Sequence, residues 1–261
     1  MQLELLYYPA DLSHKDASDP VATGLGSTAV AVGSAATGDY AAAFGQASFA
    51  SGNASTAIGR SAVASGDFST AVGQGATAAG REASAFGQGA TASGSGSLAL
   101  GQAALASGAN TVAVGGGQGA SAVADNSIAI GQGAQALATN SVAIGTGTIA
   151  DQPNTVSLGG RRLVNVAPGI ASSDAATLGQ VNAAQRRAYG GVAVAVAMGG
   201  TSIPADKTYA VSTNYGTYRG ESGFAGGLAV RVTDYATLNG SVGIGVGHGD
   251  VGGRIGAMIA W

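Results

Sequence analysis

The sequence predicts a mainly β protein, in which a parallel β-solenoid of 14-residue repeats is followed by one helix and four longer strands. Three observations support this prediction. A short apolar phrase that ends in glycine recurs through residues 23–160, and glycine makes up 46 of the 261 residues. After Lys207, segments of about ten residues alternate large apolar with small residues. The two patterns require different strand lengths and therefore two different β-structures.

The recurring phrase places a large apolar residue immediately before a glycine, from Gly33 to Gly159, and most successive glycines lie 14 residues apart. A second series of glycines, from Gly38 to Gly108, keeps the same step. A fixed period of this kind indicates a repeat architecture. Apolar residues alternate with alanine in each phrase, which favours a short strand, and the glycine supplies the positive φ of a tight corner. Two strands and two corners use fourteen residues, or one solenoid coil.

A helix is the alternative for a segment so rich in alanine, because alanine has the highest helix propensity. The recurring interior glycines argue against it, since each would cost a helix about 1 kcal/mol.

Conformational entropy predicts that the solenoid buries a further surface. Ordering one coil costs on the order of 20 kcal/mol, whereas its one or two large apolar residues contribute about 3–6 kcal/mol. We therefore expect the face that carries these residues to pack against copies of itself; a thin monomeric solenoid with capped ends is the alternative. The residues expected in this core between chains are Ile58, Val72, Phe86, Leu100, Val114, Ile130 and Ile144.

Composition excludes several classes of function. The chain has 11 basic and 14 acidic residues and a net charge of −3, which disfavours nucleic-acid binding because backbone neutralisation needs clustered Lys and Arg. It has no cysteine, so disulfide scaffolds, thiolate metal sites and cysteine nucleophiles are excluded. Its two histidines, His14 and His248, lie far apart in the sequence. We therefore expect no enzyme, no cofactor and no metal site.

The periodicity ends after Gly159, and an Arg-containing junction leads to a predicted helix. Ser173 or Asp174 is the expected N-cap, and a seam of apolar residues at spacings of three and four continues to about Met198. The alternating run at 192–197 would also suit a strand, but length and the preceding seam favour the helix. This helix is too short and glycine-flanked to span a membrane.

The four C-terminal segments are typical of transmembrane β-barrel strands, which need about 9–11 residues and carry aromatic residues near their ends. Four strands cannot close a barrel, and an open edge cannot face lipid, so closure requires several chains. Two chains would leave no room inside, whereas three would give twelve strands around a lumen able to hold three helices. A soluble four-stranded meander with one wet face is the alternative, which the near-absence of charge on the strands disfavours. The expected membrane-anchor residues are Tyr209, Phe224, Leu228, Val230, Ile244, Ile259 and Trp261.

The repeats, the junction NVAPGIASSDAATLGQV at 165–181 and the aromatic-terminated last strands together resemble the YadA-like trimeric autotransporter adhesins. The resemblance covers about Thr23 to Trp261. It implies a left-handed parallel β-roll head, three rolls side by side, a neck, a coiled coil, and a twelve-stranded outer-membrane barrel to which each chain of the homotrimer contributes four strands. The implied division is an N-terminal segment (1–22), the head repeats (23–160), the neck (161–182), a short coiled-coil or pore helix (183–205) and the barrel anchor (206–261).

The resemblance also implies a function, that of a bacterial surface adhesin that exports its own head through the barrel (type V secretion). The anchor would lie in the outer membrane and the head at the cell surface. The implied partners are the other chains of the homotrimer, the barrel-assembly machinery of the outer membrane, and a host extracellular-matrix protein or cell-surface ligand, with no nucleic acid. Binding of other surfaces is implied as well. A secreted or phage-associated β-solenoid fibre without membrane anchoring is the alternative function. An ice-binding solenoid would need a regular Thr-x-Thr ladder, which is missing.

Two strings in the head, NSIAIG at 126–131 and NSVAIG at 140–145, resemble motifs linked in the family to matrix binding. Turn and core positions are the other interpretation of these residues. The possible ligand-binding residues are Asn126, Ser127, Asn140 and Ser141.

Two features depart from the family pattern: the first 16 residues lack the basic and apolar regions of an export signal, and almost no stalk separates the neck from the anchor.

The GxGxxG string at 247–252 is expected to be a hairpin turn and not a dinucleotide loop, because a strand follows it. The GQG tripeptides lack the lysine of a phosphate-binding loop. Arg186 and Arg187 would either bind anionic headgroups, interact with acidic groups near the pore, or form a solvated helix face.

Overall fold

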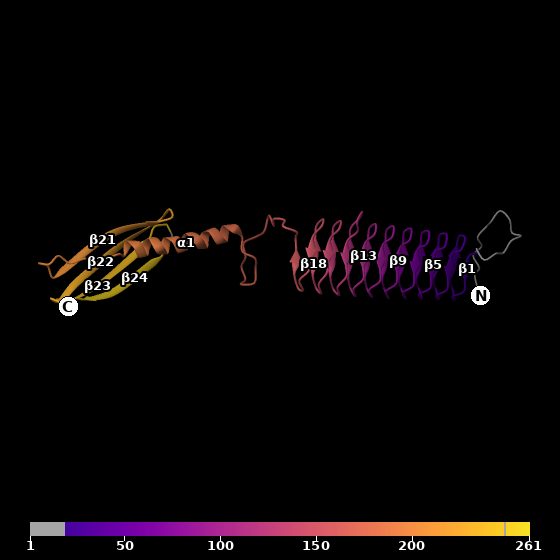
Figure 1. Cartoon of the computed structure of the whole chain (residues 1–261), viewed down its shortest axis with the longest axis horizontal. Helices are drawn as coiled ribbons and strands as arrows, with labels where there is room; N and C mark the ends of the chain where they lie inside the picture. Colours follow the sequence, from indigo (N-terminus) through magenta and orange to yellow (C-terminus); the bar gives the residue numbers. More distant parts are fainter. Residues whose placement is uncertain (1–18, 248) are drawn as a thin grey trace. The chain divides into compact units, whose positions relative to one another are not determined.

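The computed structural model describes residues 19–247 and 249–261, and the chain divides into two compact units, Met1–Arg162 and Leu163–Trp261 (Figure 1). The first unit is a parallel β-solenoid, and the second holds one helix and a four-stranded antiparallel sheet. The predicted fold class is therefore confirmed. The prediction of a missing export signal, and both His14 and His248, fall on residues that lie outside the described ones. Within the described part of the chain, no helix has the length and apolarity needed to cross a membrane.

The solenoid consists of two parallel ten-stranded sheets. The two-residue strands of one sheet are β1 (Val21–Ala22), β3 (Ala35–Ala36), β5 (Phe49–Ala50), β7 (Val63–Ala64), β9 (Thr77–Ala78), β11 (Thr91–Ala92), β13 (Leu105–Ala106), β15 (Ser121–Ala122), β17 (Gln135–Ala136) and β19 (Ile149–Ala150). The other sheet holds β2 (Thr28–Val30), β4 (Ala42–Phe44), β6 (Thr56–Ile58), β8 (Thr70–Val72), β10 (Ser84–Phe86), β12 (Leu98–Leu100), β14 (Val112–Val114), β16 (Ile128–Ile130), β18 (Val142–Ile144) and β20 (Val156–Ser157).

The register of the strands reproduces the sequence period. Ser84 of β10 pairs with Leu98 of β12, which lies 14 residues further along the chain. The step widens to 16 residues where Val112 pairs with Ile128, because two extra residues enter the glycine-rich corner at 115–119. Each coil therefore stacks on the next with equivalent residues in contact, as the repeat predicts.

Alanine fills the interior of the solenoid. The middle residue of each three-residue strand points inward, and the residue after it points outward: Ala57 is fully buried, whereas Ile58 is 42 % exposed. Buried hydroxyls fill the corners, as where Ser97 Oγ donates to the carbonyl of Gly94 at 2.6 Å. Because protein interiors are close-packed, this narrow space holds methyl groups and leaves the larger side chains outside.

Glycines of both series are needed for space, since a Cβ at Gly45 would lie 2.7 Å from the carbonyl carbon of Gly59, and most of the first series also adopt a positive φ. Gly45 and Gly59 have φ of 130° and 126°, in the region that side-chain-bearing residues rarely adopt. The predicted positive φ is confirmed for the phrase-ending glycines except Gly115, which begins the widened corner. Gly52 is needed for space, since a Cβ there would collide with the backbone carbonyl of Gly66 in the next coil.

The second unit begins with the neck segment and helix α1 (Leu178–Ala197). The prediction of Ser173 or Asp174 as N-cap is wrong. Thr177 is the N-cap: its Oγ1 accepts a hydrogen bond from Gln180 N at 3.3 Å, and Gln180 Oε1 accepts one from Thr177 N at 3.0 Å, a capping box. Asp174 instead stabilises the preceding loop, where its Oδ2 accepts hydrogen bonds from two backbone N–H groups. The run at 192–197 is helical, as predicted.

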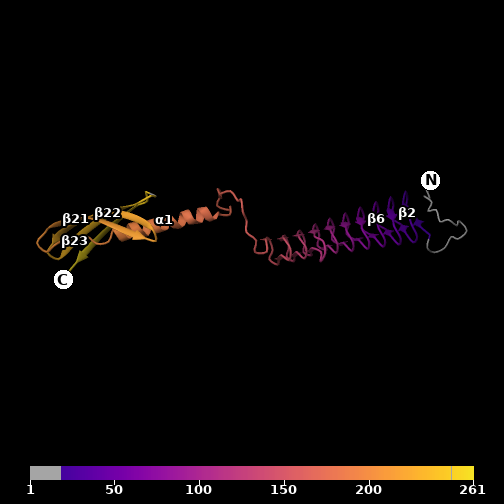
Figure 2. The same cartoon turned by 90° about the horizontal axis from the view of Figure 1, so that it is seen from above.

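The sheet of the second unit is an antiparallel meander in the order β21 (Tyr209–Tyr218), β22 (Glu221–Thr233), β23 (Ala236–Gly245) and β24 (Val251–Ile259). Helix α1 packs along one face of this sheet, and it lies beside the strands in both views (Figures 1 and 2). The GxGxxG string ends in β24, whose Val251 and Gly252 pair with Ile244 and Gly243 of β23, which confirms the predicted hairpin.

Candidate anchor and adhesive surfaces

Glycines of the sheet allow the backbone of α1 to approach it closely. A Cβ at Gly216 would lie 2.6 Å from the backbone nitrogen of Ala197, and one at Gly223 would lie 2.8 Å from that of Val194. On the third strand, Gly243 faces the Val194 side chain in the same way. The inner face of the sheet is therefore shaped for a helix, which explains why glycine occupies the inner positions where α1 crosses the strands.

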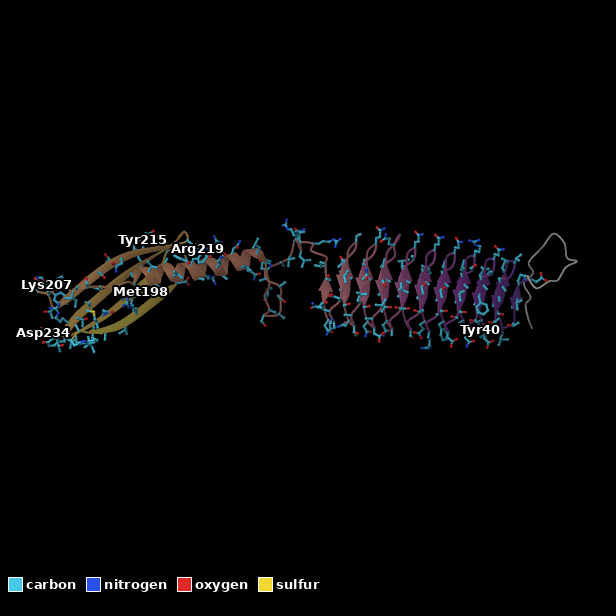
Figure 3. All side chains as sticks on the ribbon, in the orientation of Figure 1. Tyr40, Met198, Lys207, Tyr215, Arg219 and Asp234 are labelled. Carbon is cyan, nitrogen blue, oxygen red and sulfur yellow. The ribbon has the colours of Figure 1, made fainter. Side chains whose placement is uncertain are left out.

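The C-terminal end of α1 is held by polar groups of the sheet. The carbonyl of Met198, the residue labelled at this end of α1 in Figure 3, accepts hydrogen bonds. They come from Ser241 Oγ and Arg254 Nη1, both at 3.4 Å. The last turn of α1 contains no basic residue, so Arg254 supplies the positive charge that favours a helix C-terminus. Arg231 fixes the connection to β21, because its guanidinium donates to the carbonyls of Pro204 and Ala205 at 3.2 and 2.6 Å.

An aromatic cluster joins the middle of α1 to the turn between β21 and β22. The guanidinium of Arg219 lies 5.4 Å from the ring centroid of Tyr189, and its Nη1 donates to Tyr189 Oη at 3.3 Å. Tyr189 also packs edge-to-face on Tyr218, with ring centroids 5.5 Å apart. Together with the Met198 contacts, this cluster fixes the helix against the sheet at two points.

The opposite face of the sheet is apolar and unpartnered within the described chain. Tyr215, Phe224 and Ile244 are cross-strand neighbours on this face, and the residues that β21–β24 present on it carry no charge. Such an alternation of apolar outer and small or polar inner residues is typical of barrel strands in a membrane. All of the predicted anchor residues are exposed: Tyr209, Phe224, Leu228, Val230, Ile244, Ile259 and Trp261.

Among the described strands, β21 and β24 each have only one neighbour. Each therefore presents one edge of backbone N–H and C=O groups that no described strand pairs. An open edge of this kind templates pairing with another chain.

The solenoid presents a continuous apolar row on the outside of the β2–β20 sheet. Residues at equivalent positions pair from coil to coil, as Ile130 pairs with Ile144, so they form one ladder along the roll. Ile144 is 39 % exposed in the single chain. The ladder contains all of the residues expected between chains: Ile58, Val72, Phe86, Leu100, Val114, Ile130 and Ile144.

The two predicted ligand motifs begin in corner turns and continue into β16 and β18. Asn126 and Asn140 have φ of 57° and 56°, and each is hydrogen-bonded to the asparagine of a neighbouring coil, as where Asn140 Nδ2 donates to Asn154 Oδ1 at 2.7 Å. Ser127 and Ser141 are fully buried, which leaves the two asparagines as the accessible residues of these motifs. A ligand-binding role for these four residues stays a prediction.

Sequence reasoning missed the residue that ends the solenoid, Arg161. Its Nη1 donates to the carbonyl of Leu158 and to Thr148 Oγ1, both at 3.0 Å, and its Nη2 donates to the carbonyl of Thr146 at 3.3 Å. The guanidinium lies beside Gly145, where the next coil would otherwise stack. The sequence does place Arg161 directly after the last repeat, and this position could have indicated a residue that ends the solenoid.

Comparison with protein families agrees with both units. A profile described as YadA head domain repeat (2 copies) matches eight overlapping segments between 36 and 161, and one described as YadA-like membrane anchor domain matches 202–261. The chain belongs to the YadA-like trimeric autotransporter adhesins. The crystal structure of the collagen-binding domain of the Yersinia adhesin YadA is similar at 28 % identity and a TM-score of 0.51, over 68 % of this chain and 93 % of that chain. No curated protein matches.

This YadA-like chain therefore combines the head and anchor of an adhesin. The resemblance predicted from the sequence is confirmed by the two family profiles and by the similarity to the Yersinia structure.

Proposed function

We propose that three copies of the chain form a bacterial surface adhesin that exports its own head and anchors it in the outer membrane. The observation that carries this proposal is the sheet β21–β24, which has an uncharged apolar outer face and two edges without a described neighbour. Its inner face already holds a helix.

Closure explains why several chains are needed. Backbone groups at an edge cannot stay unpaired in lipid, so β24 of one chain would pair with β21 of the next until the ring closes. Three chains give twelve strands, and each brings its own α1 to the inner face. The glycines at 216, 223 and 243 make the space that these helices need.

The head also supports association between chains. The apolar row that includes Ile130 and Ile144 is exposed in a single chain, and side-by-side packing of three rolls would bury it. The proposed division is 1–22, head 23–160, neck 161–182, helix 183–205 and anchor 206–261.

The proposed partners follow from these surfaces. The barrel would be inserted by the barrel-assembly machinery, and the head would bind host extracellular matrix or a cell-surface ligand through many weak contacts that add by avidity. Collagen is the first ligand to test, because the similar Yersinia structure is a collagen-binding domain. The alternative function, a fibre without a membrane anchor, is disfavoured because it would leave the apolar outer face of the sheet exposed to water.

Fractionation of cells that produce the full chain tests the proposal. We expect the protein in the outer membrane, and a band near three times 24.7 kDa that persists in detergent until strong heating. Leu228→Arg places a charge near the middle of the outer face, at a cost of about 2–4 kcal/mol per chain in lipid, whereas the same charge near an interface costs about 0–1 kcal/mol.

Thr217→Arg, near the end of β21 and on the same face, is the matched control. Loss of membrane residence for Leu228→Arg alone would support the barrel. A soluble monomeric wild type, or equal behaviour of the two variants, would exclude it.

A further inference from the structure

One corner of the solenoid holds a residue in the left-handed conformation in each coil, two positions before the first residue of each strand of the β2–β20 sheet. In the first four coils, small and aromatic residues alternate at this position: Gly26, Tyr40, Ala54 and Phe68. Tyr40 is 67 % exposed and Phe68 is 56 % exposed, and Figure 3 marks Tyr40 on the surface near the N-terminal end of the roll. The two aromatic rings are therefore displayed on one line along the solenoid.

The spacing of this pair is fixed by the fold. Tyr40 and Phe68 are 28 residues apart, which is two coils. Neighbouring strands lie about 4.8 Å apart, so equivalent points two coils apart are separated by about 9.6 Å. This distance is close to the disaccharide repeat of an extended β-1,4-linked glycan, in which every second sugar presents the same face.

The small residue in the coil before each aromatic leaves room for its ring. A Cβ at Gly26 would lie 3.1 Å from Cδ1 of Tyr40, so the ring of Tyr40 extends over the preceding coil where glycine supplies no side chain. Ala54 is the small residue in the coil before Phe68. The rings thus have the access that stacking on the apolar C–H face of a sugar requires.

Polar groups border the same corner. Asp39, Asn53 and Asp67 follow one another coil by coil, and each accepts a backbone N–H of the preceding coil through Oδ1, at 2.9, 3.2 and 2.8 Å. Among the described residues, no hydrogen bond engages the second carboxylate oxygens of the two aspartates or Nδ2 of Asn53. At the far end, the guanidinium of Arg81 lies over the Phe68 ring, 5.7 Å from its centroid, and its Nη1 pairs with Glu82 Oε1 at 2.9 Å. Both side chains are exposed, so a sugar that stacks on Phe68 would displace this guanidinium to the edge of the ring, where its remaining N–H groups are donors. Acceptors and donors beside an aromatic pair suit the hydroxyl groups of a sugar.

We propose that Tyr40 and Phe68 form a platform that binds an extended β-1,4-linked glycan, of the cellulose or chitin type, lying along the solenoid axis. The platform rests on the proposed adhesin function, for which it names a class of surface. It lies at a corner, on residues distinct from the outward apolar row that we assign to contacts between chains.

Pull-down by insoluble glycans tests the platform. The full chain, purified in detergent, is incubated with microcrystalline cellulose, with chitin, and with insoluble α-1,4-linked starch, whose chain does not present the same face at this interval. We expect retention on cellulose, chitin or both, and none on starch. Retention on chitin alone would show that binding also requires the acetamido group, which cellulose lacks. The double variant Tyr40→Ala/Phe68→Ala is expected to weaken binding at least about tenfold.

A register variant separates spacing from composition. Tyr40→Ala/Ala54→Tyr keeps two aromatic residues but places them one coil apart, and we expect it to bind as weakly as the double alanine variant. Gly96→Tyr adds a third aromatic two coils beyond Phe68, at another left-handed position, and we expect it to strengthen binding.

Outer-membrane residence and the heat-sensitive trimer band are followed for every variant and should not change. Absence of retention on both β-1,4 glycans, equal retention on starch, or wild-type binding by the register variant would each overturn the platform while leaving the adhesin proposal standing. Loss of the trimer band in the double alanine variant would place the aromatic pair between chains and overturn it as well.

Discussion

Replacement of Ile144 by aspartate tests whether the outward apolar row of the head is buried between chains. Ile144 points out of the roll and is 39 % exposed, while the inward residue of the same strand is Ala143. In a single chain, Ile144→Asp would therefore be a surface substitution, of the kind that usually changes the free energy of unfolding by less than about 0.5 kcal/mol.

In a trimer the same change becomes costly. Burying an isoleucine contributes about 1.5–3 kcal/mol, of which the part still exposed in the single chain is about 1 kcal/mol, or about 3 kcal/mol for three chains. Each buried carboxylate adds a desolvation penalty of several kcal/mol. At about 1.4 kcal/mol per tenfold, head association should weaken by at least two orders of magnitude.

The assay is limited proteolysis and collagen binding of the full chain, with Ile149→Asp as the matched control. Ile149 lies in the same coil, is 50 % exposed, and belongs to the opposite sheet. We expect Ile144→Asp to make the head protease-sensitive and Ile149→Asp to leave it resistant. A resistant head that lost only ligand binding in Ile144→Asp, or identical behaviour of the two variants, would refute the reasoning.

Three further predictions concern single residues. Ala99→Leu, at a fully buried position, should lower the unfolding free energy of the head by about 1–3 kcal/mol in thermal denaturation, whereas Ala79→Leu on the surface should not; equal stabilities would contradict an alanine-filled interior. Arg161→Ala should speed amide exchange in the last coil, 145–159, and Arg161→Lys should rescue little, because a single ammonium cannot replace the planar fork; unchanged exchange would remove its capping role. The N–H groups of Ile170 and Ala171 lower the pKa of Asp174 from its usual 3.8, so its contribution to the neck is present above pH 3.8 and is lost as pH falls through the lowered value; an Ile170 amide that exchanges equally in wild type and Asp174→Asn across that range would contradict this.

The solenoid could be predicted because its physical requirements recur at a fixed step. Gly59 and Gly73 occupy equivalent corners of successive coils, so the assignment of a strand and a corner in one repeat is supported by the same pattern in the next. The sequence pattern alone does not decide which residues of a strand point into the roll, because Ala57 and Ile58 are both apolar. The narrow space between the two sheets decides it, and that width is a property of the assembled roll.

Local competition explains the error at the start of α1. Asp174 and Thr177 can both accept backbone N–H groups, and only the reciprocal hydrogen bonds with Gln180 select Thr177 as the N-cap. The contact of Arg254 with Met198 spans 56 residues of sequence, so no local pattern reveals it. Long-range polar contacts of this kind are set by the packing of helix on sheet.

The mass of the detergent-solubilised particle tests most directly the claim that one chain is a third of the functional assembly. Sedimentation equilibrium in density-matched detergent should give a protein mass of three times 24.7 kDa. A folded particle containing a single chain of 24.7 kDa would contradict the account, because its sheet edges and its apolar row would then need no partner.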